Sequence, residues 1–242
     1  MTVVLSGPSV ITYSRCHLLW WFIHVAAMET EPPEAQVVDL EVLEHSKWRL
    51  KGEEVVRRLD PTVEPLAEVF DRDILPTYGK PVLIDEPFQI SVHGVPFSGA
   101  IASLDRHDTS WGPEHLLRDV KTIGSKSDTH SVAYGFAMTG CYVGVTEGLA
   151  YSVTVMQLDW IARTKKPYYF PLVVPNPDKH QIGGWAATIE ITADAIARRD
   201  FHPTGLGTDA CDFCDFRDIC GPFQRFQGDR SRSTRSAKPR GS

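Results

Sequence analysis

The chain has 242 residues, of which 42% are hydrophobic and 23% charged, which is enough for one large domain or two small ones. This composition excludes a disordered, collagen-like or repeat protein. The net charge of −6 is unevenly divided, because residues 225–242 carry +5 and residues 1–224 carry −11. An acidic body excludes a general nucleic-acid coat protein and confines any nucleic-acid contact to a local surface or to the basic tail.

The first predicted element is an amphipathic, mostly buried helix from about residue 8 to 27. Its apolar run from Leu18 to Val25 is much shorter than the roughly 20 residues that a membrane span requires. The N-terminus also lacks the basic, apolar and small-residue regions of a signal peptide. We therefore expect a cytoplasmic protein without membrane contact.

Further elements follow in chain order. After Pro32 and Pro33, the pattern predicts helices over 35–50 and 53–59 and a turn at 65–70. The period then changes to two, which predicts a β-meander of strands 82–92, 97–104 and 116–122, joined by His93-Gly94 and by a polar loop at 106–114. The second half predicts a helix over 128–145, a segment at 151–161, strands at 168–174 and 186–191, and a helix over 193–199. We expect one domain over residues 1–224 and a disordered tail over 225–242.

Three of the five cysteines are clustered. Cys211, Cys214 and Cys220 have the spacing C-x2-C-x5-C, whereas Cys16 and Cys141 stand alone. Clustered thiols in an intracellular chain favour metal or redox chemistry over disulfides. The fourth ligand is either His17 or His202, which would suit zinc, or a distant cysteine, which would suit a four-iron cluster.

Asp119 and Lys121 lie two residues apart on the third predicted strand, so their side chains share one face. A carboxylate can bind a divalent metal while an ammonium steadies a scissile phosphate or positions a water, which suits phosphodiester hydrolysis. The alternative is an ordinary ion pair on an exposed strand. Asp-x-Lys alone does not distinguish these interpretations.

The motifs together resemble the RecB-like iron-sulfur exonucleases of the PD-(D/E)XK nuclease superfamily, which include the CRISPR-associated exonucleases and the nuclease domain of AddB. The resemblance covers residues 6–221 and implies a bacterial or phage protein. It also implies an α/β fold with a restriction-endonuclease-like core, in which helices flank a central mixed β-sheet. The matching residues are Ser9, Tyr13 and Cys16 of the first helix, His45, Glu86, Gly94, Gly99, Asp119-Val120-Lys121-Thr122, and the three C-terminal cysteines.

The resemblance implies a role for each matching residue. His45, Asp119 and the backbone carbonyl of Val120 would bind one Mg²⁺ or Mn²⁺, and Lys121 would orient the attacking water. Cys16 would join Cys211, Cys214 and Cys220 on a 4Fe-4S cluster that clasps the two chain ends. Glu86 and Tyr142 are candidates for supporting the metal site or contacting DNA. The implied partner is single-stranded DNA or DNA ends, in the cytoplasm of the cell or of a phage host.

Two positions depart from the family pattern. The second metal-binding aspartate would stand at position 102, which is Ala102, and Asp105 lies an odd three residues further on, where it turns to the opposite strand face. The glutamine of a Q-x3-Y motif is absent before Tyr142. We expect the chain to degrade DNA slowly and the Ala102→Asp variant to recover the lost rate. This expectation is the same whether Ala102 is engineered or natural. The alternatives are a catalytically silent DNA-binding protein with the nuclease fold and a zinc-clasped adaptor.

Overall fold

The computed structural model describes residues 4–27, 34–52, 59–124, 132–204, 211, 214, 216–222 and 224. Its contacts divide the chain into two compact units. The smaller unit combines residues from Pro8 to Glu31 with residues from Ile191 onward, and the larger unit contains Thr2–Gly7 and Pro32–Glu190. The predicted helix at 53–59, apart from its last residue, and the predicted tail at 225–242 lie outside the described residues.

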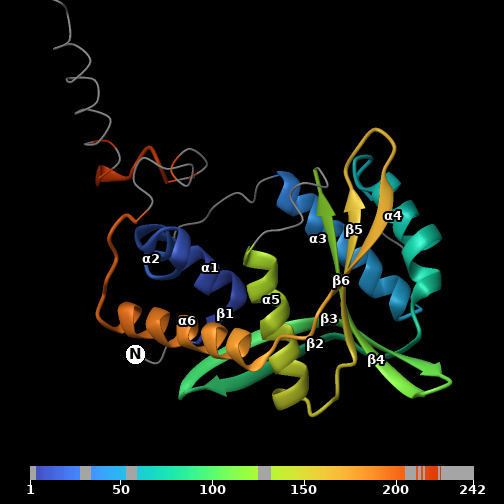
Figure 1. Cartoon of the computed structure of the whole chain (residues 1–242). Helices are drawn as coiled ribbons and strands as arrows, with labels where there is room; N and C mark the ends of the chain where they lie inside the picture. The colour runs from blue at the N-terminus through green and yellow to red at the C-terminus, as the bar shows by residue number, and fades with distance from the viewer. Residues whose placement is uncertain are drawn as a thin grey trace, which may run out of the picture. The chain divides into compact units, whose positions relative to one another are not determined.

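A six-stranded mixed sheet forms the centre of the larger unit (Figure 1). Strands β2, β3 and β4 form the predicted antiparallel meander, and its first turn is His93-Gly94, where both residues have positive φ as a tight hairpin requires. Strand β1 pairs in parallel with β3, β5 pairs in parallel with β4, and β6 returns antiparallel to β5. The strands are β1 (Leu5–Ser6), β2 (Lys80–Val92), β3 (Val95–Thr109), β4 (Gly112–Ile123), β5 (Val155–Ala162) and β6 (Tyr168–Val174).

The prediction of a polar loop at 106–114 is wrong. Strand β3 continues to Thr109, and strand β4 begins at Gly112. Their last pairs include Arg106 with His115 and His107 with Glu114. These polar side chains belong to the far end of a two-stranded ribbon. Water can reach such a ribbon, so its sequence lacks the apolar alternation that marks a strand with one buried face.

Helix α6 (Lys179–Ala197) replaces the predicted strand at 186–191 and absorbs most of the predicted helix at 193–199. It starts with a reciprocal capping box, in which the backbone N–H of Gln181 donates to Asp178 and that of Asp178 donates to the Gln181 side chain, both at 2.8 Å. Trp185 and Ile189, four residues apart, are buried. The β-branched residues at 188–192 resemble a strand, but the capping box and this spacing of four identify a helix.

The predicted N-terminal helix is two helices, α1 (Gly7–Arg15) and α2 (His17–His24). They meet at Cys16, whose extended backbone (φ −161°, ψ 118°) ends the first and precedes the second. Trp20 is buried and donates its indole N–H to Ser9 at 2.8 Å. Within the described part of the chain, none of the helices has the length and apolar character that crossing a membrane requires.

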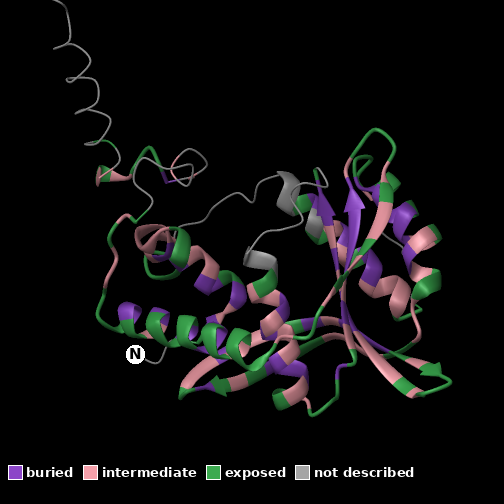
Figure 2. Ribbon diagram, viewed as in Figure 1, coloured by how far each residue is buried: buried purple, intermediate pink, exposed green. Residues whose placement is uncertain are grey.

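Three more helices pack within the larger unit. Helix α3 (Glu34–Leu50) confirms the predicted helix at 35–50, and helix α4 (Glu64–Val69) lies where the sequence predicts a turn at 65–70. The two helices bury an apolar cluster against β4 and β5 (Figure 2). Helix α5 (Val132–Val143) ends in a π-helical turn at Gly144–Gly148. Gly144 is needed there, because a Cβ atom would lie 2.6 Å from the Phe88 ring. The cluster under α3 and α4 is Val38, Val42, Val63, Leu66, Val69, Phe70, Ile74, Val120 and Ile161.

A fully buried ion pair joins β4 to β5. The Arg118 Nε donates to Asp159 at 2.8 Å, and neither side chain is exposed to water. Burying two charges is costly unless every polar atom finds a partner, and here the remaining groups do. Arg118 also donates to the Thr77 carbonyl and hydroxyl and lies 3.8 Å over the Tyr78 ring, while Asp159 accepts from Gln157 and Tyr169.

We therefore predict that Arg118→Met destabilises the fold by about 3–5 kcal/mol, because it leaves the Asp159 carboxylate buried without its cation. Chemical denaturation monitored by circular dichroism measures this. Arg106→Met is the matched control, since Arg106 pairs with Asp108 in an exposed ion pair and should change stability little. Equal losses in the two variants would contradict the prediction.

Candidate functional site

A cavity of about 160 Å³ lies among α3, α5 and the β2–β4 meander. It is lined by Asp119 and Lys121 of β4, Ala102 of β3, Asp85 of β2 and Lys47 of α3. The fold thus brings the Asp-x-Lys motif and position 102 together, as the family pattern implies. It adds two charged residues, Asp85 and Lys47, that the sequence analysis missed. The remaining lining residues are Leu43, Ala100, Leu117, Arg118, Met138 and Cys141.

Asp119 and Lys121 share one face of β4, as predicted, and form an ion pair with Nζ 3.1 Å from Oδ2. Their side chains are 16% and 29% exposed, so the pair lies inside the cavity rather than on an open strand surface. Water screens such a partly buried pair less than a surface pair. A reacting phosphate in this cavity would therefore experience both charges.

The strand register places three residues in a row across the sheet. The pairs Ile84–Ser103 and Glu86–Ile101 set Asp85 of β2 opposite Ala102 of β3. On its other side, Ala102 comes one residue before Ser103, which pairs with Arg118, so Ala102 lies beside Asp119. Cross-strand neighbours point to the same side of a sheet. Ala102 thus lies between two carboxylates that face one cavity.

Lys47 holds the Asp85 carboxylate. Its Nζ lies 2.9 Å from Asp85 and 3.1 Å from Glu44, and the Lys47 side chain is only 15% exposed. Burial acts to lower the pKa of the Lys47 ammonium, but its hydrogen bonds to Asp85 and Glu44 outweigh burial and raise that pKa. Lys47 reaches the cavity because it follows Leu43 by one helical turn, so both lie on the same face of α3.

The structure places His45 outside this cavity, contrary to its expected role as a metal ligand beside Asp119. Two residues from Lys47 on the same helix, it points to a different side. Its Nε2 lies 3.1 Å from Asp71, which also accepts from Arg49 at 2.9 Å, and the imidazole lies edge-on to Phe70. The sequence lacks the glycine of the family's Gly-x3-His pattern, and this absence was the one sign that His45 departs from the family pattern.

Three other candidates also lie elsewhere. Asp105 is fully buried, accepts a hydrogen bond from the Gly79 backbone N–H at 2.7 Å and lies 2.6 Å from His107, so the offset of three does turn it away from Ala102. Glu86 is exposed on β2 and is not among the residues lining the cavity. Tyr142 directly follows Cys141 but does not line the cavity either.

The donor chemistry of the cavity fits a hard divalent cation. Asp85 and Asp119 offer carboxylate oxygens, which are the ligands that Mg²⁺ and Mn²⁺ prefer. Val120 belongs to the apolar cluster under α3 and α4 and is not among the residues that line the cavity. Each carboxylate is now neutralised by a lysine ammonium. A cation would take over part of that neutralisation.

The predicted cluster cysteines belong to the smaller unit and form no disulfides. Burial raises the pKa of the Cys214 thiol, and the charges of Cys16, Cys220 and Cys211 raise it further, so each of these three lies within electrostatic reach of Cys214. Their sulfur atoms are not arranged as a closed metal site in the part of the chain that the structure describes.

His17 and His202, the two predicted zinc candidates, are near each other in the same unit. Together with Asp200 they offer ligand atoms within 4.8 Å of one another. His202 Nδ1 lies 2.5 Å from the Asp200 carboxylate, and the Tyr13 hydroxyl donates to the Asp200 carbonyl at 2.7 Å. These contacts join the first helices to the segment after α6, although 187 residues separate Tyr13 from Asp200.

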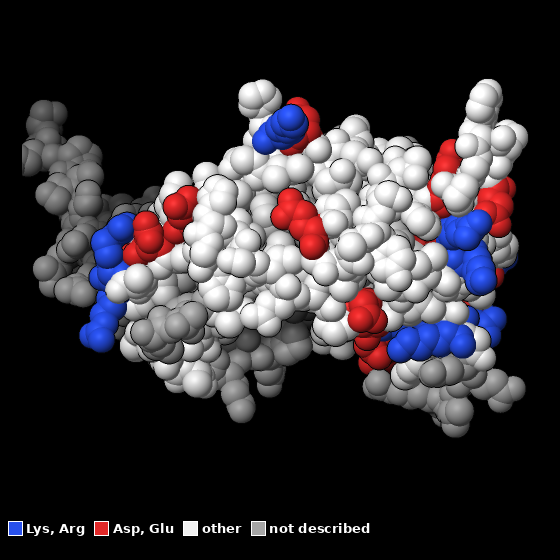
Figure 3. Space-filling model, turned by 90° about the horizontal axis from the view of Figure 1, so that it is seen from below, with Lys and Arg blue, Asp and Glu red and all other residues white. Residues whose placement is uncertain are grey.

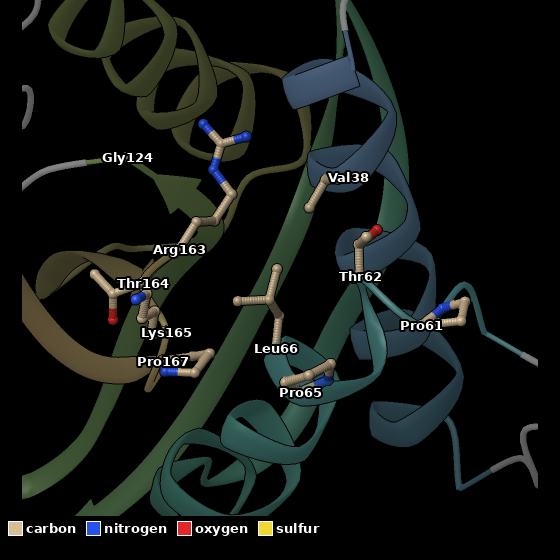
Figure 4. A pocket seen from close by; sticks show the side chains of 10 residues that line it. All are labelled: Val38, Pro61, Thr62, Pro65, Leu66, Gly124, Arg163, Thr164, Lys165 and Pro167. Atoms are coloured by element: carbon tan, nitrogen blue, oxygen red, sulfur yellow. The ribbon is translucent and has the colours of Figure 1, made fainter.

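A larger cavity of about 510 Å³ contains none of the predicted site residues (Figure 4). Arg163 and Lys165 of the β5–β6 connection face Val38 and Leu66 across it. On the face drawn in Figure 3, the described charged side chains form small groups and leave wide uncharged areas. The candidate site is therefore the smaller cavity, which holds the Asp-x-Lys motif. The larger cavity is lined by Val38, Pro61, Thr62, Pro65, Leu66, Gly124, Arg163, Thr164, Lys165 and Pro167.

Comparisons with known proteins identify the superfamily and a similar fold. The sequence profile of the PD-(D/E)XK nuclease superfamily matches residues 21–221. A crystal structure described as a "putative exonuclease" from Eubacterium rectale is similar in fold, with a TM-score of 0.60 at 10% identity over 90% of this chain and 88% of that one. The structure of SSO0001 has a TM-score of 0.40 at 13% identity, over 84% and 94% of the two chains. No curated protein sequence matches the chain significantly.

Cys141 provides a test of how closed the cavity is. Cys141 is half-buried, and burial of its thiol, with the nearby Asp119 carboxylate, raises the pKa of that thiol to about 12. At pH 8 about one molecule in 10⁴ would carry the reactive thiolate, so we predict that iodoacetamide leaves Cys141 unmodified in the folded protein. Peptide mass spectrometry should detect alkylation only after denaturation. Rapid alkylation of the native protein would show that the thiol is accessible and ionised.

Proposed function

The chain belongs to the PD-(D/E)XK nuclease superfamily, and we propose that it is a DNA exonuclease that hydrolyses phosphodiester bonds with Mg²⁺ or Mn²⁺. The observation that carries this proposal is the cavity that holds Asp119 and Lys121 beside position 102. The proposed substrate is single-stranded DNA or DNA ends, in recombination, repair or phage DNA processing. We place this activity in the cytoplasm of a bacterium or phage host.

The cavity residues divide the work of hydrolysis. Asp119 and the Val120 carbonyl would hold the divalent ion, which when bound acidifies a water and neutralises the phosphate. Lys121 would orient the attacking water and stabilise the negative charge that develops on the phosphate oxygens. His45, whose Nε2 lies 3.1 Å from Asp71, is not among the residues that line the cavity. Ala102 leaves one carboxylate fewer than the family pattern has, which lowers turnover.

An iron-sulfur cluster is the second part of the proposal. Cys16 from between α1 and α2 and Cys211, Cys214 and Cys220 would bind a 4Fe-4S cluster that clasps the chain ends. The electrostatic effect of Cys16, Cys211 and Cys220 on the Cys214 thiol supports it. The ring contact of Phe22 with Phe216, at 4.9 Å between centroids, also supports it, because it joins the same two segments. The cluster would draw the four sulfurs together and complete one nuclease domain over residues 1–224.

A catalytically silent DNA-binding protein is the alternative function. Ala102 favours it, since the loss of a carboxylate removes catalysis while the fold remains. Retention of both Asp119 and Lys121 in a partly buried cavity favours the nuclease, because DNA binding alone needs no paired acid and base there.

We predict that Ala102→Asp increases Mn²⁺-dependent degradation of end-labelled DNA. Adding Lys121→Ala to that variant should return the rate to background, because the remaining Lys47 is held by Asp85 and Glu44. Gel assays with and without chelator measure both rates. An Ala102→Asp protein that is folded and binds DNA but remains inert would support the silent DNA-binding alternative.

We predict that anaerobically purified protein is brown, absorbs broadly near 400 nm and contains about four irons per chain. Cys16→Ala should lose the colour and the iron together, whereas Cys141→Ala, whose thiol lies in the other unit, should keep both. Metal analysis and absorbance spectroscopy provide the measurements. A colourless protein with stoichiometric zinc would exclude the cluster.

A further inference from the structure

We propose that Asp85 supplies the metal-binding carboxylate that Ala102 lacks, so that β2 and β4 together form the cation site across the alanine between them. This inference rests on the proposed nuclease function and concerns the ligands of the same cavity. It differs from the family pattern, in which the second acid would come from β3 at position 102. The acid has moved by one strand.

The register of β2, β3 and β4 supports this assignment. Asp85 lies opposite Ala102, and Ala102 lies beside Asp119, so the two acids flank the position that the family pattern assigns to a carboxylate. All three residues line the same cavity. The alanine side chain is a single methyl group, which leaves the space between the flanking carboxylates open to a small cation.

The backbone at Asp85 is the second argument. Its φ of +54° is left-handed, although it lies inside β2 between the paired residues Ile84 and Glu86. A residue other than glycine rarely adopts this conformation in a strand, because it is sterically strained. Aspartate tolerates it better than most residues. This distortion interrupts the regular pairing of β2 with β3 at Asp85, the β2 residue that lines the cavity.

Lys47 also supports this assignment, because the Asp85 carboxylate in the cavity already pairs with a cation, the Lys47 ammonium. The ammonium lies 2.9 Å from Asp85 and is itself only 15% exposed. Glu44 lies 3.1 Å from the same ammonium and is a second partner for it. A divalent ion that takes Asp85 therefore need not leave Lys47 without a counterion. Lys47 competes with the metal, and its removal should strengthen metal binding.

The experiment measures Mn²⁺ binding by the full-length protein, with electron paramagnetic resonance of free Mn²⁺ in a titration without DNA. Asp85→Asn should weaken Mn²⁺ binding at least tenfold, as Asp119→Asn should. Asp108→Asn is the matched control, since Asp108 also pairs with a basic residue but is 77% exposed on β3 and lies outside the cavity. It should leave binding unchanged. Circular dichroism verifies the fold of each variant.

Two further variants separate a ligand role from a structural one. Lys47→Met should strengthen Mn²⁺ binding, a change of sign that misfolding does not produce. Ala102→Asp introduced into Asp85→Asn should recover the lost affinity, because it places a carboxylate back between the same strands. If Lys47→Met weakens binding, or if Ala102→Asp recovers none of it, the assignment of Asp85 is wrong.

The outcomes distinguish this inference from the proposed function. Loss of binding in Asp119→Asn but not in Asp85→Asn would overturn the assignment of Asp85 and leave the nuclease proposal intact. Binding that depends on Asp85, in a protein that cleaves no DNA even as Ala102→Asp, would support the assignment and overturn the nuclease proposal. A wild-type protein that binds no Mn²⁺ would overturn both.

Discussion

The buried pair of Arg118 and Asp159 is the constraint on which the geometry of the site depends. Arg118 directly precedes Asp119 on β4, and successive residues of a strand point to opposite sides. While Arg118 is held by Asp159 of β5, Asp119 and Lys121 must face the cavity. A slip of one residue between β4 and β5 would bury Asp119 and expose Arg118. A network without catalytic chemistry thus fixes the orientation of the residues that carry the chemistry.

The cavity is balanced in charge without any cation. Asp85 faces Lys47 and Asp119 faces Lys121, so two acids and two ammonium groups share a small, partly dry space. This balance makes the metal-free state tolerable, since an unpaired carboxylate at such a site is costly. It also makes metal binding a competition between a divalent ion and two lysines. The cavity therefore keeps two carboxylates, each paired with a lysine, although position 102 is alanine.

The smaller unit shows a different principle. Its two segments are nearly two hundred residues apart, yet aromatic contacts and the Tyr13 hydrogen bond to Asp200 hold them together. Closing so long a loop has an entropic cost, which these contacts offset. Cys16 lies between α1 and α2 as the N-cap residue of α2. Its backbone is therefore extended rather than helical.

Local pattern determined several features of this protein from the sequence alone. They are the meander with its His93-Gly94 turn, the span of β6, and the shared face of Asp119 and Lys121, all of which follow from a period of two or from turn chemistry. The helix over residues 186–191 also has local signals, the capping box and the spacing of Trp185 and Ile189, which the β-branched residues outweighed in the prediction. Tertiary structure alone decided that His45 turns to Asp71. It also decided that Asp85 and Lys47 enter the site, because cross-strand register and helix orientation depend on residues far away in the chain. The hydrophobic period of one segment does not indicate which other segment of the chain packs beside it.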